Sequence, residues 1–359
     1  MKTKFTRILS IFLVLIMLFG VSASGADTEK MTDFLSSWLK KNITVSQAEG
    51  SIDSYLDWTV FAMARNGYTD YNDAYKAYIG NAVSKNWESL YLNDYARISL
   101  AVMSVGMDTS DIGGKNLIEA IEKTDYKDEA YTGSIAYALV ALDAAKSDNE
   151  AARNSLKEIL IASQREDGSF NSYLAADESA YWTVSGETDS TGITLQALAP
   201  YKNENDVKAV IDKAISFIRN EQMDDGGFGS WGTGSAESTS MILCGLCAVG
   251  EDPDCYIKNS KSIIDSLPAY INEDGGARCW DGSSNIMTSY QVLMGLSSYE
   301  RYKENKVGLY DMSCLSPHCN SIEHSAFFER FPLLGRILCK IVAVFCNIFG
   351  IKYYCCKHN

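Results

Sequence analysis

The chain has 359 residues, of which 46% are hydrophobic and 22% are charged, and its formal net charge is −14. Low-complexity disorder is excluded, because this much apolar side chain can offset the entropy that is lost on folding. The acidic excess argues against a nucleic-acid partner, since phosphate contacts need clustered Lys and Arg.

The chain begins with the pattern of a secretory signal. Three basic residues precede the apolar run 8–19, and small residues follow as far as Ala26. The run is too short to span about 30 Å of hydrocarbon, which argues against a membrane anchor. We therefore expect residues 1–26 to be a cleaved signal peptide and the mature protein to be secreted.

Residues 30–313 contain a repeated pair of helices. Six apolar segments rich in small residues are hydrophobic on nearly every face, which predicts buried helices at 55–65, 95–103, 133–142, 191–198, 238–246 and 288–296. A more polar, amphipathic helix is predicted before each of them, at about 32–41, 70–85, 114–123, 151–164, 204–221 and 255–269. Buried helices that alternate with half-exposed ones indicate two concentric layers. The predicted fold is an all-α (α/α)6 toroid with six inner and six outer helices.

The last three helix pairs share a sharper motif. The segments 164–170 and 222–228 both read Q-x-x-x-G-x-F, and 272–276 is a degenerate third copy. A tryptophan follows each copy, and the three are 49 residues apart, at Trp182, Trp231 and Trp280. Acidic and hydroxyl residues then open each inner helix, a composition that is typical of helix N-caps.

With these motifs the sequence resembles the prenyltransferase/squalene-cyclase repeat superfamily, the α/α toroids, over about residues 54–313. The Q-x-x-x-G-x-F elements look like the glutamine–aromatic motifs of that family. The resemblance is closest to secreted bacterial members, through segments such as AESTSMILCGLCAVG. It implies the toroid fold, and it leaves the chemistry open, because one fold hosts many functions.

Two chemistries of the family can be tested on the residues. Zinc-dependent prenyl transfer needs Asp, Cys and His ligands, but residues 27–313 contain no histidine, and Cys279 is predicted to be structural. We therefore expect no metal and no cofactor. The cyclase acid motif D-x-D-D-T is similar to residues 187–191, where only the central acid, Asp189, is kept and Glu187 replaces the first. N-capping by these residues is the competing interpretation.

A third chemistry is that of carbohydrate-active α/α barrels, which use two carboxylates about 5–9 Å apart. Glu187, Asp189 and Glu237 occupy corresponding ends of neighbouring inner helices and are the candidates for such a pair. We expect a cavity rimmed by these acids and by aromatic residues, namely Tyr95, Trp182 and Trp231. Tryptophans that only seal turns are the alternative. The favoured function is a non-catalytic module that binds a small molecule or a cell-surface partner, with a cyclase-like or carbohydrate-active enzyme as the alternative.

The tail, residues 314–359, differs from the body in composition. It holds six of the ten cysteines, all three histidines, and five basic residues against two acidic ones. Apolar positions from Phe327 to Ile348 step by three and four, which predicts an amphipathic helix. We expect residues 327–352 to attach the secreted body to an anionic membrane surface. A helix docked on the body and a spanning anchor are the alternatives. The disulfide pairing stays open, and a zinc site at Cys314, His318, Cys319 and His324 matches no standard spacing.

Overall fold

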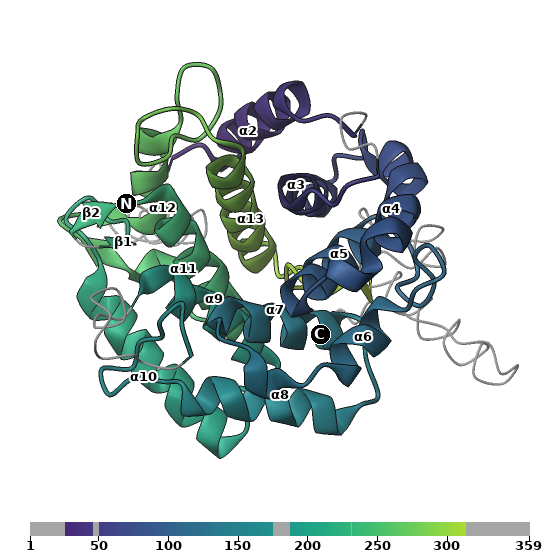
Figure 1. The fold of residues 1–359 in the computed structure, drawn as a ribbon. Helices are drawn as coiled ribbons and strands as arrows, with labels where there is room; N and C mark the ends of the chain where they lie inside the picture. Colours follow the sequence, from purple (N-terminus) through teal and green to yellow (C-terminus); the bar gives the residue numbers. More distant parts are fainter. Residues whose placement is uncertain (1–25, 46–49, 175–186, 231, 314–359) are drawn as a thin grey trace, which may run out of the picture.

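The computed structural model describes residues 26–45, 50–174, 187–230 and 232–313. Within these ranges six helices form a closed inner ring, in which each packs on the next and the last packs on the first (Figure 1). They are α3 (Ser54–Arg65), α5 (Leu92–Ser104), α7 (Thr132–Ala144), α9 (Thr188–Leu198), α11 (Ala236–Val249) and α13 (Ile286–Lys303). The predicted toroid is confirmed. Residues 1–25 of the predicted signal peptide and the whole predicted tail helix lie outside the described residues.

Outer helices surround this ring (Figure 1). They are α2 (Thr28–Asn42), α4 (Asn72–Asn86), α6 (Leu117–Lys123), α8 (Glu150–Ala162), α10 (Asn205–Glu221) and α12 (Ile263–Ser266). Helix α10 buries Val207, Val210, Ile211, Ala214, Phe217 and Ile218. These residues recur at the spacing of one helix face, so α10 covers the ring with one side and leaves its polar side to water. Inner helix α11 is buried on nearly all sides instead.

The sixth outer helix differs from the prediction. The segment 255–269 contains a short hairpin of β3 (Ile257–Lys258) and β4 (Lys261–Ser262), followed by one turn of α12 and a 3₁₀ turn at Leu267–Tyr270. Asn259 and Ser260 have φ values of 50° and 63°, as a two-residue hairpin loop requires and a helix forbids. A second hairpin, β1 (Gly229–Ser230) and β2 (Thr233–Gly234), precedes α11.

The glutamine of the repeated motif joins one helix pair to the next. Gln222 Nε2 donates to the carbonyl of Gly226 in its own turn and to that of Tyr256 beyond it, at 2.8 Å each. Gln164 makes the same two bonds, to Gly168 and to Val210 of α10. Both turn glycines have φ near +90°, and a Cβ there would lie 2.4 Å from a backbone oxygen of the next outer segment. The motif therefore needs glycine both for its turn and for close packing.

A hydroxyl on each of the last three inner helices holds the turn of the repeated motif against the ring. In three successive units the fourth residue of the helix accepts a hydrogen bond from the backbone N–H of the turn. These pairs are Phe170 to Thr191, Phe228 to Thr239 and Ala277 to Ser289, at 2.9–3.0 Å. The turns, the inner helices and the outer layer are thus connected by one bonding pattern.

The last unit closes the ring on the first. Trp38 Nε1 of α2 donates to Asp274 Oδ2 in the degenerate third turn at 2.9 Å, and Gly275 packs against the backbone of Phe34. At the other end of the ring, Arg65 of α3 donates to the carbonyls of Gly308 and Asp311. No helix among the described residues combines the length and the hydrophobicity of a membrane span.

Candidate functional site

The inner helices of this toroid begin at the same end of the ring, and their first turns form what we call the N-terminal face. Side chains on neighbouring helices meet there. Asp189 of α9 accepts a hydrogen bond from the hydroxyl of Ser238 on α11, and Glu237 of α11 accepts one from Thr288 on α13. In both contacts the acid is the second residue of its own helix, and the hydroxyl belongs to the third residue of the next inner helix. The same spacing therefore links three inner helices.

Further hydrogen bonds to this acidic cluster also come from within the chain. Glu187 accepts from the N–H and hydroxyl of Ser172 and from Ser190 Oγ, the last at 2.9 Å. Ser235 Oγ donates to Glu237 Oε2 at 2.8 Å, and Thr188 Oγ1 lies 3.3 Å from Asp189 Oδ1. The cluster is thus a network of carboxylates and hydroxyls.

The electrostatics single out Asp189 within this cluster. Burial raises the pKa of its carboxyl, and the charges of Glu187 and Glu237 raise it further, while the bond from Ser238 opposes the shift. A carboxyl with such a raised pKa holds its proton more readily than an exposed one. Asp189 is therefore the residue of the cluster best suited to donate a proton or a hydrogen bond.

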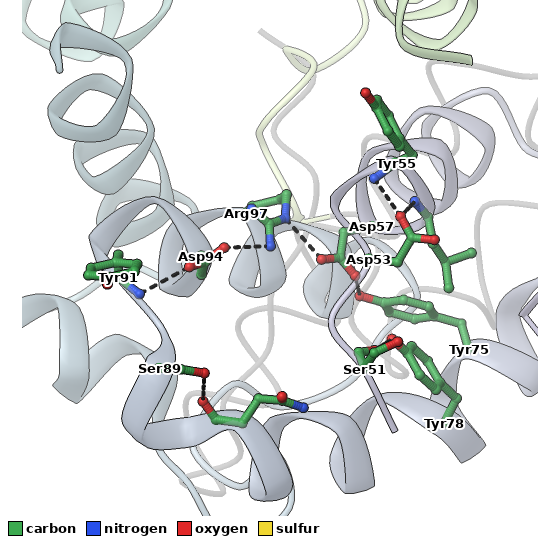
Figure 2. A network of polar contacts seen from close by, with 12 residues as sticks. Ser51, Asp53, Tyr55, Asp57, Tyr75, Tyr78, Ser89, Tyr91, Asp94 and Arg97 are labelled. Atoms are coloured by element: carbon green, nitrogen blue, oxygen red, sulfur yellow. Dashed lines mark hydrogen bonds and ion pairs between the residues drawn. The ribbon is translucent and has the colours of Figure 1, made fainter. Parts of the chain in front are cut away.

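A second polar network lies between α3 and α5, on the other side of the ring (Figure 2). Arg97 donates to Asp57 at 2.9 Å and pairs with Asp94 at 2.7 Å, and the Tyr75 hydroxyl donates to Asp57 at 2.7 Å. Burial raises the pKa of Asp57, although the Arg97 charge lowers it. We did not select this pair from the sequence. Its signal was the presence of charged residues, Asp57 and Arg97, inside two segments that are predicted to be buried.

Exposed aromatic side chains gather at the N-terminal face. Among the described residues eight large hydrophobic side chains are exposed, and four of them lie at the start of an inner helix or directly before it: Tyr55, Tyr91, Tyr131 and Met287. Two more are exposed in connecting segments, Tyr173, which forms a β-bridge with Tyr131, and Trp280, which precedes α13. The rings of Tyr131 and Tyr173 lie 5.1 Å apart. Trp280 is 94% exposed, so this tryptophan does not seal a turn.

The comparisons with known proteins agree with this architecture. Residues 174–298 match the family model of the squalene-hopene cyclase C-terminal domain. The match supports a relationship between this part of the chain and the terpenoid cyclase and prenyltransferase-like α/α toroids. The match includes the acidic cluster together with α9, α10 and α11.

Solved structures of α/α barrels are similar in fold. Two structures of unsaturated glucuronyl hydrolase from Streptococcus agalactiae, one of a mutant, superpose with TM-scores of 0.56 and 0.54 at 12% and 13% identity, covering 80% of this chain and 94% of theirs. The enzyme from Bacillus sp. GL1 gives 0.52 at 12% identity, covering 78% and 97%. At such identities the likeness shows the fold alone.

In this toroid the stretch that resembles the superfamily's acid motif carries only part of it. Asp189 stands at the central position and is buried, but the next acid is replaced by Ser190, which donates to Glu187. A second carboxyl directly after Asp189 is therefore absent from the motif. Within the described ranges, no group of three or more His, Cys, Asp or Glu side chains is arranged to hold a metal ion.

The predicted site residues of the toroid divide into three groups. Glu187, Asp189 and Glu237 come together, as their places on neighbouring helices predicted. Tyr95 lies apart from them, since it packs against Trp87, which follows outer helix α4, at 5.1 Å. Trp182 and Trp231 lie outside the described residues. The sequence analysis did not predict the exposed tyrosines. Their position could have indicated them, because Tyr91 and Tyr131 directly precede inner helices, where side chains are expected to be exposed.

Proposed function

We propose that this protein is a toroidal binding module that takes a neutral glycan across its N-terminal face. The observation that carries the proposal is the set of exposed aromatic side chains at this face, which also holds the acidic cluster. Aromatic walls with a few polar groups are typical of ligand sites, and sugar rings offer C–H faces for stacking and hydroxyls for carboxylates. A neutral ligand fits better than an anionic one, because Glu187, Asp189 and Glu237 would repel an anion.

The bonding of the acidic cluster favours binding over turnover. The carboxylates of Glu187, Asp189 and Glu237 already accept hydrogen bonds from hydroxyls of the chain itself. A catalytic carboxyl has to reach the bond that it cleaves. Groups held by their own protein are better suited to fix the helix ends and the shape of the face.

The test is affinity electrophoresis with neutral polysaccharides, hydroxyethyl cellulose and dextran, and with the anionic hyaluronan. We expect retardation by a neutral polymer and none by hyaluronan. Replacing Tyr91 and Tyr131 by alanine should weaken the binding at least about tenfold, since each stacked ring contributes about 1 kcal/mol. Ile257→Ala is the matched control, because Ile257 is exposed on β3. Equal retardation of the variant and the control would refute the proposal.

Acid catalysis at Asp189 is the second candidate. Its support is the raised pKa of a buried carboxyl that is flanked by two others, the arrangement used by proton donors. The similar barrels are enzymes named as glucuronyl hydrolases. The purified protein should be incubated with oligosaccharides and with squalene. Turnover of squalene that Asp189→Asn abolishes would favour a cyclase, whereas oligosaccharide cleavage that Glu237→Gln abolishes would favour a glycosidase.

We further propose that the protein is secreted and that its tail holds it at the outer face of the membrane. The support is the signal pattern of residues 1–26 and the basic, amphipathic pattern of residues 327–352. Flotation with anionic liposomes tests the tail. The mature chain should float in low salt and be released by high salt, and a chain ending at Ser313 should not float. Equal flotation of both chains would contradict this proposal.

A further inference from the structure

The opposite end of the ring contains an open cavity of about 1160 Å³, which we call the C-terminal cavity. The last turns of α7, α9, α11 and α13 form its walls, and the segment 305–312 runs along it. Alanines and Val140 give it apolar surface, while Gln196, Asp143 and several lysines contribute polar groups. Its volume suffices for a ligand of ordinary metabolite size. It shares no residue with the N-terminal face.

Two acceptor atoms of the cavity residues are buried without a donor among the described residues. Gln196 is 4% exposed, and its Nε2 donates to the Gly192 carbonyl, but its Oε1 has no partner. Asp143 accepts from the Tyr201 hydroxyl at 2.8 Å through Oδ1, while its Oδ2 has none. Buried polar atoms are normally satisfied. These two oxygens therefore point to a ligand that brings hydroxyl or amine donors.

The charge of the cavity is opposite to that of the protein. Its lining contains five basic residues, Lys146, Lys202, Arg301, Lys303 and Lys306, against the acids Asp143 and Asp311. Lys303 and Lys306 are paired with Asp254 and Glu304, which lie outside the lining, and Asp143 with Arg153 in the same way. Lys202 Nζ donates to the carbonyl of Val249, which is neutral, so that bond leaves its positive charge uncompensated. Burial raises the pKa of Asp143 to about 6, which reduces the opposing negative charge further in mildly acidic solution.

We propose that the C-terminal cavity binds a small hydroxylated organic anion, a sugar phosphate or a sugar acid. The ligand hydroxyls donate to Gln196 Oε1 and Asp143 Oδ2, its carbon skeleton packs on the alanines, and its anionic group lies among the lysines. The chain's own tail is disfavoured as the occupant, because it is basic like the cavity. The site is separate from the proposed glycan face, so either proposal can fail without the other.

The experiment is isothermal titration of the full mature chain at constant ionic strength with four probes: glucose 6-phosphate, gluconate, glucose and inorganic phosphate. The site needs both the charge and the hydroxyls. We therefore expect at least one of the hydroxylated anions to bind at least about tenfold more tightly than both glucose and phosphate, which is a free-energy difference of about 1.4 kcal/mol. Comparing glucose 6-phosphate with gluconate distinguishes a sugar phosphate from a sugar acid.

Variants place the binding in the cavity. Lys202→Gln and, separately, Lys306→Gln should each weaken binding several-fold while the unliganded protein keeps its melting temperature. Lys208→Gln is the control, since Lys208 pairs with Asp212 on the exposed side of α10, and it should bind as the wild type does. The proposal is overturned if no probe binds, if all four bind alike, or if the control weakens binding as much as the cavity variants.

Discussion

The two halves of the ring are held together by different means. In the half that contains α9, α11 and α13, neutral glutamines and hydroxyls repeat one bonding pattern from unit to unit. In the half that contains α3 and α5, that pattern is missing, and the buried pair of Asp57 and Arg97 joins the neighbouring inner helices. Neutral bonds can be repeated at little desolvation cost, whereas a buried ion pair tolerates no loss of either partner. The half that contains α3 and α5 should therefore lose more stability when one polar side chain is removed.

The largest expected effect follows from breaking the ion pair. Arg97→Met leaves the Asp57 carboxylate buried without its counter-charge, so the free energy of unfolding should fall by about 3–5 kcal/mol. Urea unfolding followed by circular dichroism measures it. The double variant Asp57→Leu with Arg97→Met should regain only part of this loss, because the buried Tyr75 hydroxyl then has no acceptor. A single variant as stable as the wild type would show that the pair carries no such vulnerability.

A smaller effect is expected in the repeated half. Gln222→Leu removes the donor to two buried carbonyls, which should cost about 2–3 kcal/mol. Gln164→Leu should cost less, because Gln164 is less completely buried and water can replace part of its bonding. The comparison uses the same urea titration. If Gln164→Leu were the more damaging variant, burial would not be what sets the strength of these contacts.

The hydrogen bond from Trp38 to Asp274, which closes the ring, should contribute less to the free energy of unfolding than the glutamines do, and its contribution should depend on pH. Trp38→Phe removes the donor to Asp274 and should cost about 1 kcal/mol at neutral pH. Bonds from Ser284, Gly276 and Trp38 lower the pKa of Asp274. A lowered carboxyl pKa stabilises the fold above the ordinary value, and this contribution is lost as the pH falls through the lowered one. Wild type and variant should therefore converge in acid, which thermal melts across the acid range can check.

The smallest expected effect is a gain in stability, on replacing Asp189. Because burial raises the pKa of Asp189, its ionised form costs stability above the ordinary carboxyl value, and the cost is complete above the raised value. Asp189→Asn keeps an acceptor for Ser238 and removes the charge. It should raise the melting temperature slightly at neutral pH and leave it unchanged in acid. A lower melting temperature at neutral pH would mean that the carboxylate itself stabilises this face.

Much of the fold could be predicted because its determinants are local. The alternation of apolar and amphipathic segments follows from helix periodicity, and the turn glycines have one conformational role in each repeat. The hairpin at 257–262 was missed because its two-residue turn lacks glycine, so Asn259 and Ser260 gave a weak signal.

The candidate site was predicted only in part, for the same reason. Asp189 and Glu237 share a register in consecutive repeats, and Glu187 lies two residues before Asp189, so the repeat itself brings the three together. Asp57 and Arg97 lie 40 residues apart and carry no repeated motif. The C-terminal cavity depends on where the segment 305–312 runs, which no local pattern specifies.

The contact between Trp38 and Asp274 joins residues that are 236 positions apart. An open solenoid can gain or lose a repeat at its end, because each unit needs only its neighbours. Here the last turn needs the first helix, so inserting or deleting one helix pair would pull that contact apart. Closure thus fixes the number of units in this ring, and a new function has to come from the two faces rather than from added length.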